Sequence, residues 1–557
     1  MREHILDAPT MTTETSASHA VSAAEIAARL DRLPATRSIW LMVLLLSLGS
    51  FFEFYELIST AYVMPGLIKS GIFSTTTQSM FGMTGAASYI AATLVGIFLG
   101  VLLLGPVTDR MGRRAVFTYA LLGYSLATAI LAFQTDAYTL SFWRLIVGVF
   151  LGVELITIDT YLSEIVPPQI RGRAFAILRT CSWIAAPVVA LIAYLLVPIQ
   201  VFSIDGWRWV FWIGASGAFF VWFLRRNLPE SPRWLASRGR FDEAHAVLSE
   251  IENKVRRDYG AALPQPVPAA LIDTGEAIKF SGLWSKPYRT RTLMLLVCQV
   301  GMGIALYGFT YWMPTFLVEH GIGITKSLEY SLIISCMYPL GPCIAVFFAD
   351  RFERKWQLLF VGSLLIAGGV YFVDLRSAAS LIAAGSVVTL AIAVVPMVVH
   401  TYQNELYPTR HRALATSIVV AVGRLGGAVS GFLIAAALRY AGVTGALTVI
   451  CGAMAVSMLA IVMFGPRTRG RSLEEMVTPM ADDNKRDAKS SSEEIFDEHA
   501  GRYSETIDQT LGRFGASHDF FTRHKAKLIE RMLASRGRVQ AEIDLLDVGC
   551  GIANIHS

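Results

Sequence analysis

Two glutamates lie in the middle of the first long apolar run of the sequence, which extends from Trp40 to about Leu67. Glu53 and Glu56 are three positions apart, so a helix places them on one face. An ionised side chain at the centre of a membrane helix costs about 2.5 to 3.5 kcal/mol, and such groups therefore face a protein interior or a water-filled cavity. The spacing predicts a proton- or ligand-binding site rather than a lipid-facing surface.

Arg144 is a basic residue that lies at a similar predicted depth. With a helical rise of about 1.5 Å per residue, Glu53 and Glu56 lie roughly 20 and 24 Å from the inner face, and Arg144 roughly 21 Å. A buried carboxyl tends to take up a proton, whereas a neighbouring guanidinium favours the ionised form. We therefore predict proton coupling by Glu56, Arg144 and Glu53. A permanent ion pair that joins the first and fourth helices is the alternative.

A second arginine is the candidate for binding an anionic substrate. Arg424 lies roughly 18 Å from the inner face, and a guanidinium can bind a carboxylate through two hydrogen bonds. Arg179 lies about two turns inside its helix, so it is predicted either to bind substrate or to extend to the interface at a gate. The other predicted substrate-binding residues are Tyr55, Gln299, Tyr307, Tyr311 and Trp312. For each aromatic residue among them, ordinary helix packing is the alternative.

The composition is that of a membrane protein. Hydrophobic residues make up 54% of the 557 residues and charged residues 16%, which is too apolar for a soluble chain. We predict an all-α protein with about twelve transmembrane helices in two six-helix bundles. The predicted spans lie near 40–65, 82–107, 115–134, 138–162, 173–198 and 208–225, and then near 291–318, 328–349, 356–374, 379–403, 413–438 and 443–465.

Basic residues in alternate loops predict the orientation. Lys and Arg cluster in the loops near residues 110–114, 171–173, 351–355 and 410–412, and such loops lie on the cytoplasmic side. Both ends of the helical core are therefore predicted to be cytoplasmic. The net charge of +5 then reflects topology, and we expect no nucleic-acid partner. Residues 1–38 contain no cleavable signal pattern, although Ala24–Leu33 predicts a helix at the membrane interface.

The same patterns divide the chain into five segments. A short amphipathic helix is predicted at Phe241–Val255 within the connection between the two bundles. The six cysteines have no metal-site or disulfide spacing, so we expect no metal. The predicted segments are a cytoplasmic N-terminal segment at 1–38, the first bundle at 39–225, a cytoplasmic connection at 226–290, the second bundle at 291–466 and a cytoplasmic tail at 467–557.

An internal repeat relates the two bundles. The pair Asp109-Arg110 recurs 241 positions later as Asp350-Arg351. The pattern Tyr161-x-x-Glu164-x-x-Pro167-x-x-x-Arg171 recurs at the same offset, from Tyr402 to Arg412. Parallel repeats of six spans imply two bundles related by an axis along the membrane normal, with a binding site between them.

These motifs resemble those of the major facilitator superfamily, on its sugar porter and metabolite:proton symporter side. The resemblance covers roughly residues 22–478 and rests on Gly105-Pro-Val-Thr-Asp109-Arg110-Met-Gly112-Arg113-Arg114, on the Tyr161 motif, on Pro229-Glu230-Ser231-Pro232-Arg233 and on Pro466 to Glu475. Arg467 departs from the family pattern, which has an acidic residue there. In proton-coupled relatives the acid that closes the helix-one motif pairs with the helix-four arginine, which implies roles for Glu56 and Arg144.

The polar residues that sugar porters use are missing from two helices. The fifth predicted span reads Ile177-Leu-Arg179-Thr-Cys-Ser182 and the seventh reads Gln299-Val-Gly-Met-Gly303. With the acid pair of the first span, the chain is similar to the branch that carries niacin-like, aromatic or other organic acids with protons. This resemblance implies an anionic substrate.

Carboxylates and guanidiniums at the cytoplasmic helix ends predict a gate, because such pairs can form in one global state and separate in another. A role as topology anchors is the alternative for any single arginine. Glu353 replaces the glycine of the first copy, which predicts an altered turn. The predicted gate residues are Asp109, Arg110, Gly112, Arg113, Glu154, Glu164, Arg171, Glu230, Arg233, Asp350, Arg351, Glu405 and Arg412.

The tail ends in Asp547-Val-Gly549-Cys-Gly551, which resembles the glycine-rich first motif of class I methyltransferases that bind S-adenosylmethionine. The chain stops a few residues later, without the rest of the sheet, so we expect no methyltransferase activity.

We therefore predict a multi-pass inner- or plasma-membrane protein that carries a small organic anion with protons by alternating access. The expected partners are the substrate and the lipid bilayer, and the expected state is a monomer with no catalytic residues and no cofactor apart from the coupling proton. The alternatives are a proton-antiport exporter, a sugar or polyol porter, a methyltransferase fusion and a membrane sensor.

Overall fold

The computed structural model describes residues 22–466, apart from 75–76, 83–86, 225–227, 267–279, 349–351, 376 and 408. The methyltransferase-like tail, the gate residues Asp350 and Arg351, and the divergent Arg467 therefore lie outside the described residues.

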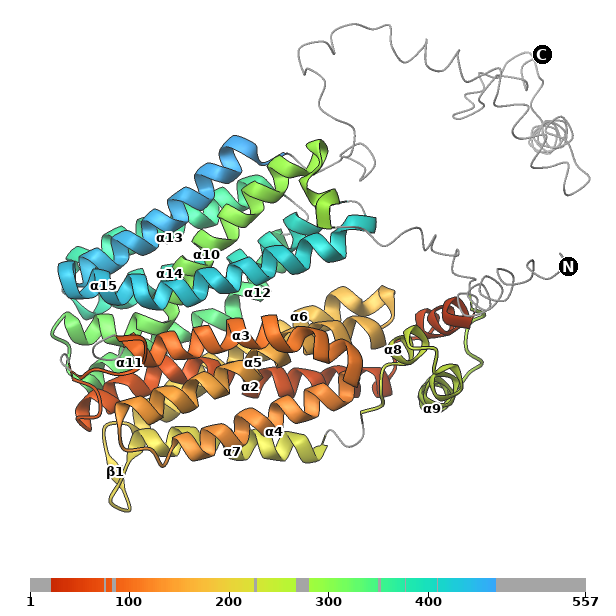
Figure 1. Cartoon of the computed structure of the whole chain (residues 1–557), viewed down its shortest axis with the longest axis horizontal. Helices are drawn as coiled ribbons and strands as arrows, with labels where there is room; N and C mark the ends of the chain where they lie inside the picture. The colour runs from red at the N-terminus through yellow and green to blue at the C-terminus, as the bar shows by residue number, and fades with distance from the viewer. Residues whose placement is uncertain are drawn as a thin grey trace, which may run out of the picture. The chain divides into compact units, whose positions relative to one another are not determined.

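Six long helices form the first half of the chain, drawn from red to yellow in Figure 1. A hairpin of β1 (Gln200–Val201) and β2 (Ile204–Asp205) joins the last two, and a 3₁₀ turn, η1 (Met80–Gly82), precedes the second. The six helices match the predicted spans and are α2 (Arg37–Lys69), α3 (Ala87–Met111), α4 (Arg113–Leu131), α5 (Ala137–Ile165), α6 (Pro168–Leu196) and α7 (Gly206–Leu224).

The second half repeats this order in green and blue (Figure 1). Its helices are α10 (Lys286–Glu319), α11 (Ile324–Ser335), α12 (Met337–Phe348), α13 (Arg354–Asp374), α14 (Ala378–Glu405) and α15 (Thr409–Phe464). Two differ from the prediction. The span near 328–349 is interrupted between α11 and α12, where Pro339 lacks the N–H that would bond the Ser335 carbonyl. The two last spans form α15, which Gly442 breaks with a φ of +62°.

By length and composition, ten helical stretches of the described chain can cross a membrane. One of them, Leu414–Phe464, contains two predicted spans, and the apolar helix α7 adds one more. The fold is therefore the predicted all-α membrane fold with about twelve spans.

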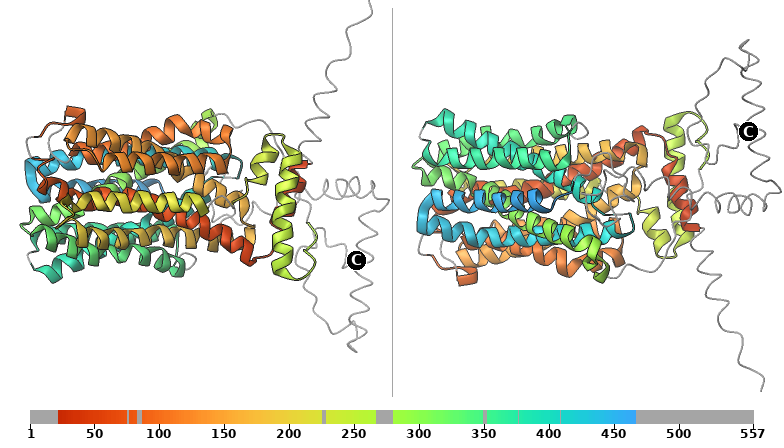
Figure 2. Two further views of the ribbon diagram at one scale, coloured as in Figure 1. Left: turned by 90° about the horizontal axis from the view of Figure 1, so that it is seen from below. Right: turned by 90° about the horizontal axis from the view of Figure 1, so that it is seen from above.

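The described part of the connection between the halves contains α8 (Pro232–Ser237), α9 (Phe241–Tyr259) and the 3₁₀ turn η3 (Phe280–Trp284). Figure 2 shows α9 at one end of the bundle, beside the helix of residues 22–31 drawn in red. Ile26 and Leu30 of that helix are buried in one cluster with Leu248 and Ile251 of α9. The apolar face predicted to lie at the membrane interface thus packs against another helix.

Glycines allow α3 and α5 to approach closely, and this approach positions the site. A Cβ added at Gly96 would collide with the Leu145 carbonyl, and one added at Gly148 would collide with the Thr93 carbonyl. The backbones therefore meet one turn from Arg144, whose side chain reaches across α3 toward α2.

The two halves meet through α3 and α15, through α2 and α10, and through α6 with α11 and α12. Several of these contacts lie toward the side predicted to be extracellular. A Cβ added at Gly431 would lie 3.1 Å from the Ala91 Cα atom, and the rings of Phe81 and Phe432 pack with their centroids 5.7 Å apart. These contacts hold the outer ends of the halves together.

Candidate functional site

The centre of the first half contains a buried ion pair. Arg144 of α5 is fully buried, and its Nη1 donates to Oε1 of Glu56, which is also buried. Arg144 Nη2 also donates to the Glu56 carbonyl at 2.6 Å. The sequence predicted similar depths for Glu56 and Arg144, and in the structure these two residues are in direct contact. Their proton-coupling role stays a prediction.

Further groups from three helices surround this pair. Arg144 Nε donates to Thr93 Oγ1 at 3.1 Å, and Thr128 Oγ1 donates to Glu56 Oε1 at 2.9 Å. The rings of Tyr89 and Phe211 lie on the guanidinium, each with its centroid 5.5 Å from Cζ. Within the described residues, Glu56 Oε2 has no hydrogen-bond partner. One carboxylate oxygen thus accepts hydrogen bonds from Arg144 and Thr128, whereas the other accepts none from the described residues.

Glu53 lies one helical turn closer to the cytoplasm, in different surroundings. Its side chain is 1% exposed, and its Oε1 makes no hydrogen bond to any described residue. Four charged side chains act on it electrostatically, from α5, α6 and α15: Glu154, Asp159, Arg179 and Arg424. Glu53 and these four residues are called the central charged cluster below. They come from both halves of the chain.

The sequence prediction placed Glu154 in the cytoplasmic gate, whereas in the structure Glu154 belongs to the central charged cluster. It is fully buried, and α5 continues for eleven residues beyond it, to Ile165. At about 1.5 Å per residue, Glu154 is roughly 16 Å from that end. The sequence prediction grouped it with the loop motifs, whereas the fold places it beside Glu53.

The two arginines of the central charged cluster differ in their contacts. Arg179 forms an ion pair with Asp159, a residue that the sequence prediction missed although it lies as an isolated acid in an apolar run. Arg424 donates to the Tyr307 hydroxyl. The guanidinium of Arg424 therefore has a neutral partner, which an anion can replace.

A chain of polar side chains lies beside Arg424. Gln299 Nε2 of α10 donates to Gln403 Oε1 of α14 at 3.3 Å, and Gln403 Nε2 is 2.9 Å from His400 Nδ1. Gln299 also lies close to Gly423, the residue before Arg424. This arrangement brings the predicted Gln299 to the cluster and adds Gln403 and His400.

The predicted aromatic residues divide into two groups. Tyr307 and Tyr311 pack together with ring centroids 5.9 Å apart, and Tyr311 acts electrostatically on both Arg144 and Arg424. Trp312 is buried in the core. Tyr55 instead donates to the Val210 carbonyl of α7 at 2.8 Å. Its hydroxyl thus points into the first half, so the prediction that Tyr55 lines the substrate site is wrong in this structure.

At the cytoplasmic end of the first half, Arg113 forms an ion pair with Glu164 at 3.2 Å. Glu230 Oε1 accepts from the backbone N–H groups of Arg113 and Arg114 at 2.9 and 3.1 Å, at the start of α4. Gly112, with φ of +95°, makes the turn that permits this contact, because an added Cβ would lie 2.5 Å from Glu230 Oε2. These four predicted gate residues, Gly112, Arg113, Glu164 and Glu230, therefore form one group.

The other predicted gate residues of the first half lie elsewhere. Arg171 donates to the Val166 carbonyl at 3.4 Å and does not contact Glu164 in the described structure. Arg233 forms an ion pair with Asp31 of the helix at 22–31, and Arg110 is exposed. The side chain of Asp109 lies outside the described part of the chain.

The second half contains a matching ion pair. Arg354 Nε donates to Glu405 Oε1 at 3.1 Å, and both residues follow Arg113 and Glu164 by 241 positions. The gate prediction named Glu405 but missed Arg354, which the offset could have identified. Glu353 has a φ of −58°, so the altered turn that was predicted there is present. The side chain of Arg412 lies outside the part of the chain that the structure describes.

A second set of cytoplasmic contacts joins the helix of residues 22–31 to α9. Glu252 accepts from Arg29 at 2.8 Å and from Arg32 at 2.7 Å, and these three residues are called the cytoplasmic clamp. Burial acts to raise the pKa of Glu252, but the hydrogen bonds and charges of Arg29 and Arg32 outweigh it and lower that pKa below its ordinary value.

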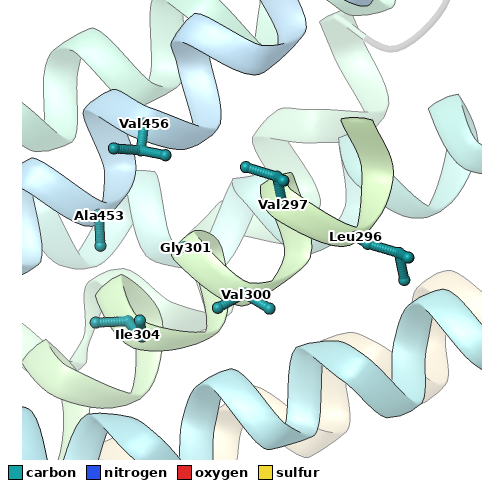
Figure 3. A pocket seen from close by; sticks show the side chains of 7 residues that line it. All are labelled: Leu296, Val297, Val300, Gly301, Ile304, Ala453 and Val456. Atoms are coloured by element: carbon teal, nitrogen blue, oxygen red, sulfur yellow. The ribbon is translucent and has the colours of Figure 1, made fainter. Parts of the chain in front are cut away.

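An apolar hollow of about 430 Å³ lies between α10 and α15, away from the charged residues (Figure 3). Val297 and Val456 on its rim are exposed. Because only aliphatic side chains and a glycine line it, this hollow has nothing to orient a polar substrate, and it fits a lipid-facing surface. In the described residues, no group of three or more His, Cys, Asp or Glu side chains could hold a metal ion.

Two repeated bundles of six membrane helices, with charged residues buried between them, define a secondary transporter. Residues 42–479 match the family model described as "Sugar (and other) transporter". The chain therefore belongs to the sugar transporter family of the major facilitator superfamily and is a multi-pass membrane transporter. The family match ends at residue 479 and does not bear out the methyltransferase resemblance of the tail.

Relatives support this assignment over nearly their whole length. The chain is 30% identical over 463 residues to the inner membrane metabolite transport protein YdjE of Escherichia coli, covering 81% of this chain and 98% of that protein. It is 28% identical to the niacin transporter NiaP of Acinetobacter baylyi, over 81% of this chain and 99% of that one. The solved structure of the E. coli xylose transporter XylE, partially occluded and inward open, matches with a TM-score of 0.60 at 20% identity, over 78% of this chain and 99% of XylE.

Proposed function

We propose that this transporter carries a small carboxylate together with protons, in the same direction. The observation that carries the proposal is the buried pair of Glu56 and Arg144, at the centre of the first half. Burying a charged pair at this depth costs free energy, and apolar residues could join the two helices at lower cost. The presence of the pair therefore favours a role in coupling over a purely structural role.

The geometry of the pair supports a coupling step. While Arg144 contacts Glu56, its guanidinium is the counter-ion of the carboxylate. When the helices move and separate the two groups, Glu56 Oε2, which has no described hydrogen-bond partner, can take a proton from the outer solution. Re-formation of the pair in the inward-facing state releases that proton to the cytoplasm. In the structure the two groups are paired.

The surroundings of Arg424 support a carboxylate as the substrate. Its guanidinium donates to the neutral hydroxyl of Tyr307, whose ring packs against that of Tyr311. A flat carboxylic acid matches this combination of a bidentate cation and aromatic surfaces. The relative named as a niacin transporter is consistent with such a substrate.

A sugar or polyol porter is the second candidate. The amides of Gln299 and Gln403 can donate and accept hydrogen bonds to hydroxyl groups, and they lie beside Arg424. A D-xylose transporter is among the relatives, at 25% identity. An uptake screen with both classes of substrate separates the two candidates.

The test uses the full chain in proteoliposomes with an imposed pH gradient. Radiolabelled nicotinate, benzoate, a short aliphatic acid and xylose are compared, and we expect acid-stimulated uptake of a carboxylate. Glu56→Gln should abolish proton-driven net uptake, because a neutral side chain cannot re-form the ion pair with Arg144 when the empty transporter returns. Exchange of labelled for unlabelled substrate should be retained, because exchange does not use that return step. Glu319→Gln makes the same change at an exposed site and is the control. Unchanged proton-driven uptake by Glu56→Gln would overturn the coupling role, and uptake of xylose alone would overturn the substrate class.

A further inference from the structure

The central charged cluster is not neutral. Three carboxylates, those of Glu53, Glu154 and Asp159, face two guanidiniums, those of Arg179 and Arg424. The five groups carry a net charge of −1 when all are ionised. Among the described residues, the other titratable groups that act on the cluster are His400 of α14 and Tyr307 and Tyr311 of α10.

The contacts within the cluster show which carboxylate depends on Arg424. Asp159 forms an ion pair with Arg179, so each of these two groups already has a counter-ion. Glu53 and Arg424 act electrostatically on each other, across the boundary between the two halves. Arg179 acts on Glu53 more strongly than Arg424 does, but Arg179 is already paired with Asp159. Arg424 contacts the Tyr307 hydroxyl, so it is the guanidinium of the cluster whose charge is left for Glu53.

Binding of an anion changes this balance. A substrate carboxylate on Arg424 would use the positive charge that Glu53 faces, and it would bring the net charge of the occupied cluster to −2 with all groups ionised. Glu53 is 1% exposed, and its Oε1 makes no hydrogen bond within the described chain. A buried charge without a counter-ion is costly and is neutralised by protonation.

We propose that Glu53 is a second proton site, loaded when the substrate carboxylate occupies Arg424, so that each monocarboxylate enters with two protons. One proton is on Glu56 and the other on Glu53. The proton forms an O–H bond with a Glu53 carboxylate oxygen on the outer side, and that bond breaks when the substrate leaves Arg424 on the inner side. Nothing is oxidised or reduced. This inference rests on the proposed function.

The two proton sites, Glu56 and Glu53, respond to different events. Glu56 responds to the position of Arg144, which depends on helix movement, whereas Glu53 responds to the substrate itself. One monoanion moving with two protons transfers one net positive charge, whereas one proton would make transport electroneutral. The number of protons can therefore be measured directly.

The experiment measures the substrate concentration gradient at which net transport stops under a fixed pH difference. The full chain is in proteoliposomes, and potassium with valinomycin holds the membrane potential at zero. The probe is nicotinate, or the carboxylate that the uptake screen identifies. With two protons, one pH unit balances about a hundredfold substrate gradient, and with one proton it balances about a tenfold gradient. We expect the hundredfold value for the wild type and for Glu319→Gln, and the tenfold value for Glu53→Gln.

Two outcomes would overturn the proposal. A tenfold value for the wild type would show that there is no second proton, and a hundredfold value for Glu53→Gln would show that the second proton is elsewhere. If Glu53→Gln does not transport, proton uptake on nicotinate binding is measured in detergent with a pH dye in weak buffer. The variant should then take up one proton fewer than the wild type. Equal proton uptake by the two proteins would contradict the proposal. If the wild type takes up no carboxylate at all, the proposed function fails first, and this inference fails with it.

Discussion

Arg424 contacts the hydroxyl of Tyr307, and a substrate carboxylate would replace this contact. A lysine at the same position keeps the positive charge but presents a single ammonium in place of the planar fork. The value of this arginine therefore lies in its geometry as well as its charge.

We expect Arg424→Lys to weaken binding of a carboxylate substrate about tenfold, or about 1.4 kcal/mol, because one of two parallel hydrogen bonds is lost. The measurement is the concentration dependence of uptake, with the KM rising more than the maximal rate falls. Arg439→Lys, at an exposed position of the same helix, is the matched control and should leave both values unchanged. An unchanged KM in Arg424→Lys would remove Arg424 from the substrate site.

At the scale of the helix, the cytoplasmic clamp joins the helix of residues 22–31 to α9. The pKa of Glu252 is lowered in the folded protein, so the ionised form stabilises the folded arrangement. That contribution is complete above the ordinary pKa of a glutamate, and it is lost as the pH falls through the lowered pKa. The clamp should therefore weaken only in acid.

We expect Glu252→Gln to release the helix of residues 22–31 at neutral pH, because Arg29 and Arg32 lose their shared carboxylate. Hydrogen exchange of residues 22–31 measures the release, and the wild type should show it only in acid. Glu250→Gln is the control, since Glu250 forms an exposed pair with Lys254 on the same helix. Equal protection in Glu252→Gln and wild type at neutral pH would show that apolar packing alone holds this helix.

The helices and the side-chain contacts differ in how far the sequence predicts them. The length of an apolar run reflects the thickness of the membrane, so the spans and the pairing depth of Glu56 and Arg144 could be predicted. The rotation of each helix depends on packing against its neighbours, which the length of the run does not determine. For this reason the contact of Tyr55 with α7 and the pair of Asp159 with Arg179 could not be predicted. The repeat offset, in contrast, already implies the pair of Arg354 with Glu405.

At the scale of the whole transporter, the outer ends of the two halves are in contact. Gly431 of α15 lies against Ala91 of α3, and the rings of Phe81 and Phe432 pack with centroids 5.7 Å apart. Alternating access requires contacts of this kind to open when the outer side admits substrate.

We expect Gly431→Leu to shift the equilibrium toward the outward-open state by about tenfold or more, because overpacking a tight contact costs about 1–3 kcal/mol. Spin labels on cysteines placed at Phe202 and Tyr440, which are 85% and 84% exposed, measure the opening, with the native cysteines replaced by serine. Gly452→Leu is the control, because a Cβ at Gly452 meets no heavy atom within 4 Å. Identical distance distributions in all three proteins would show that this contact does not govern the outer closure.

The two matching ion pairs, Arg113 with Glu164 and Arg354 with Glu405, each lie within one half of the chain, and this bears on how the protein is made. The Tyr161 hydroxyl donates to the carbonyl of Pro229, just after α7, and the Tyr402 hydroxyl donates to the carbonyl of Pro466, just after α15, at 2.9 Å. Each half thus binds the chain that leaves its own last helix. During synthesis, the first bundle can complete these contacts soon after Pro229 leaves the ribosome, before the second bundle exists. The halves are then assembly units in the membrane as well as moving parts in transport.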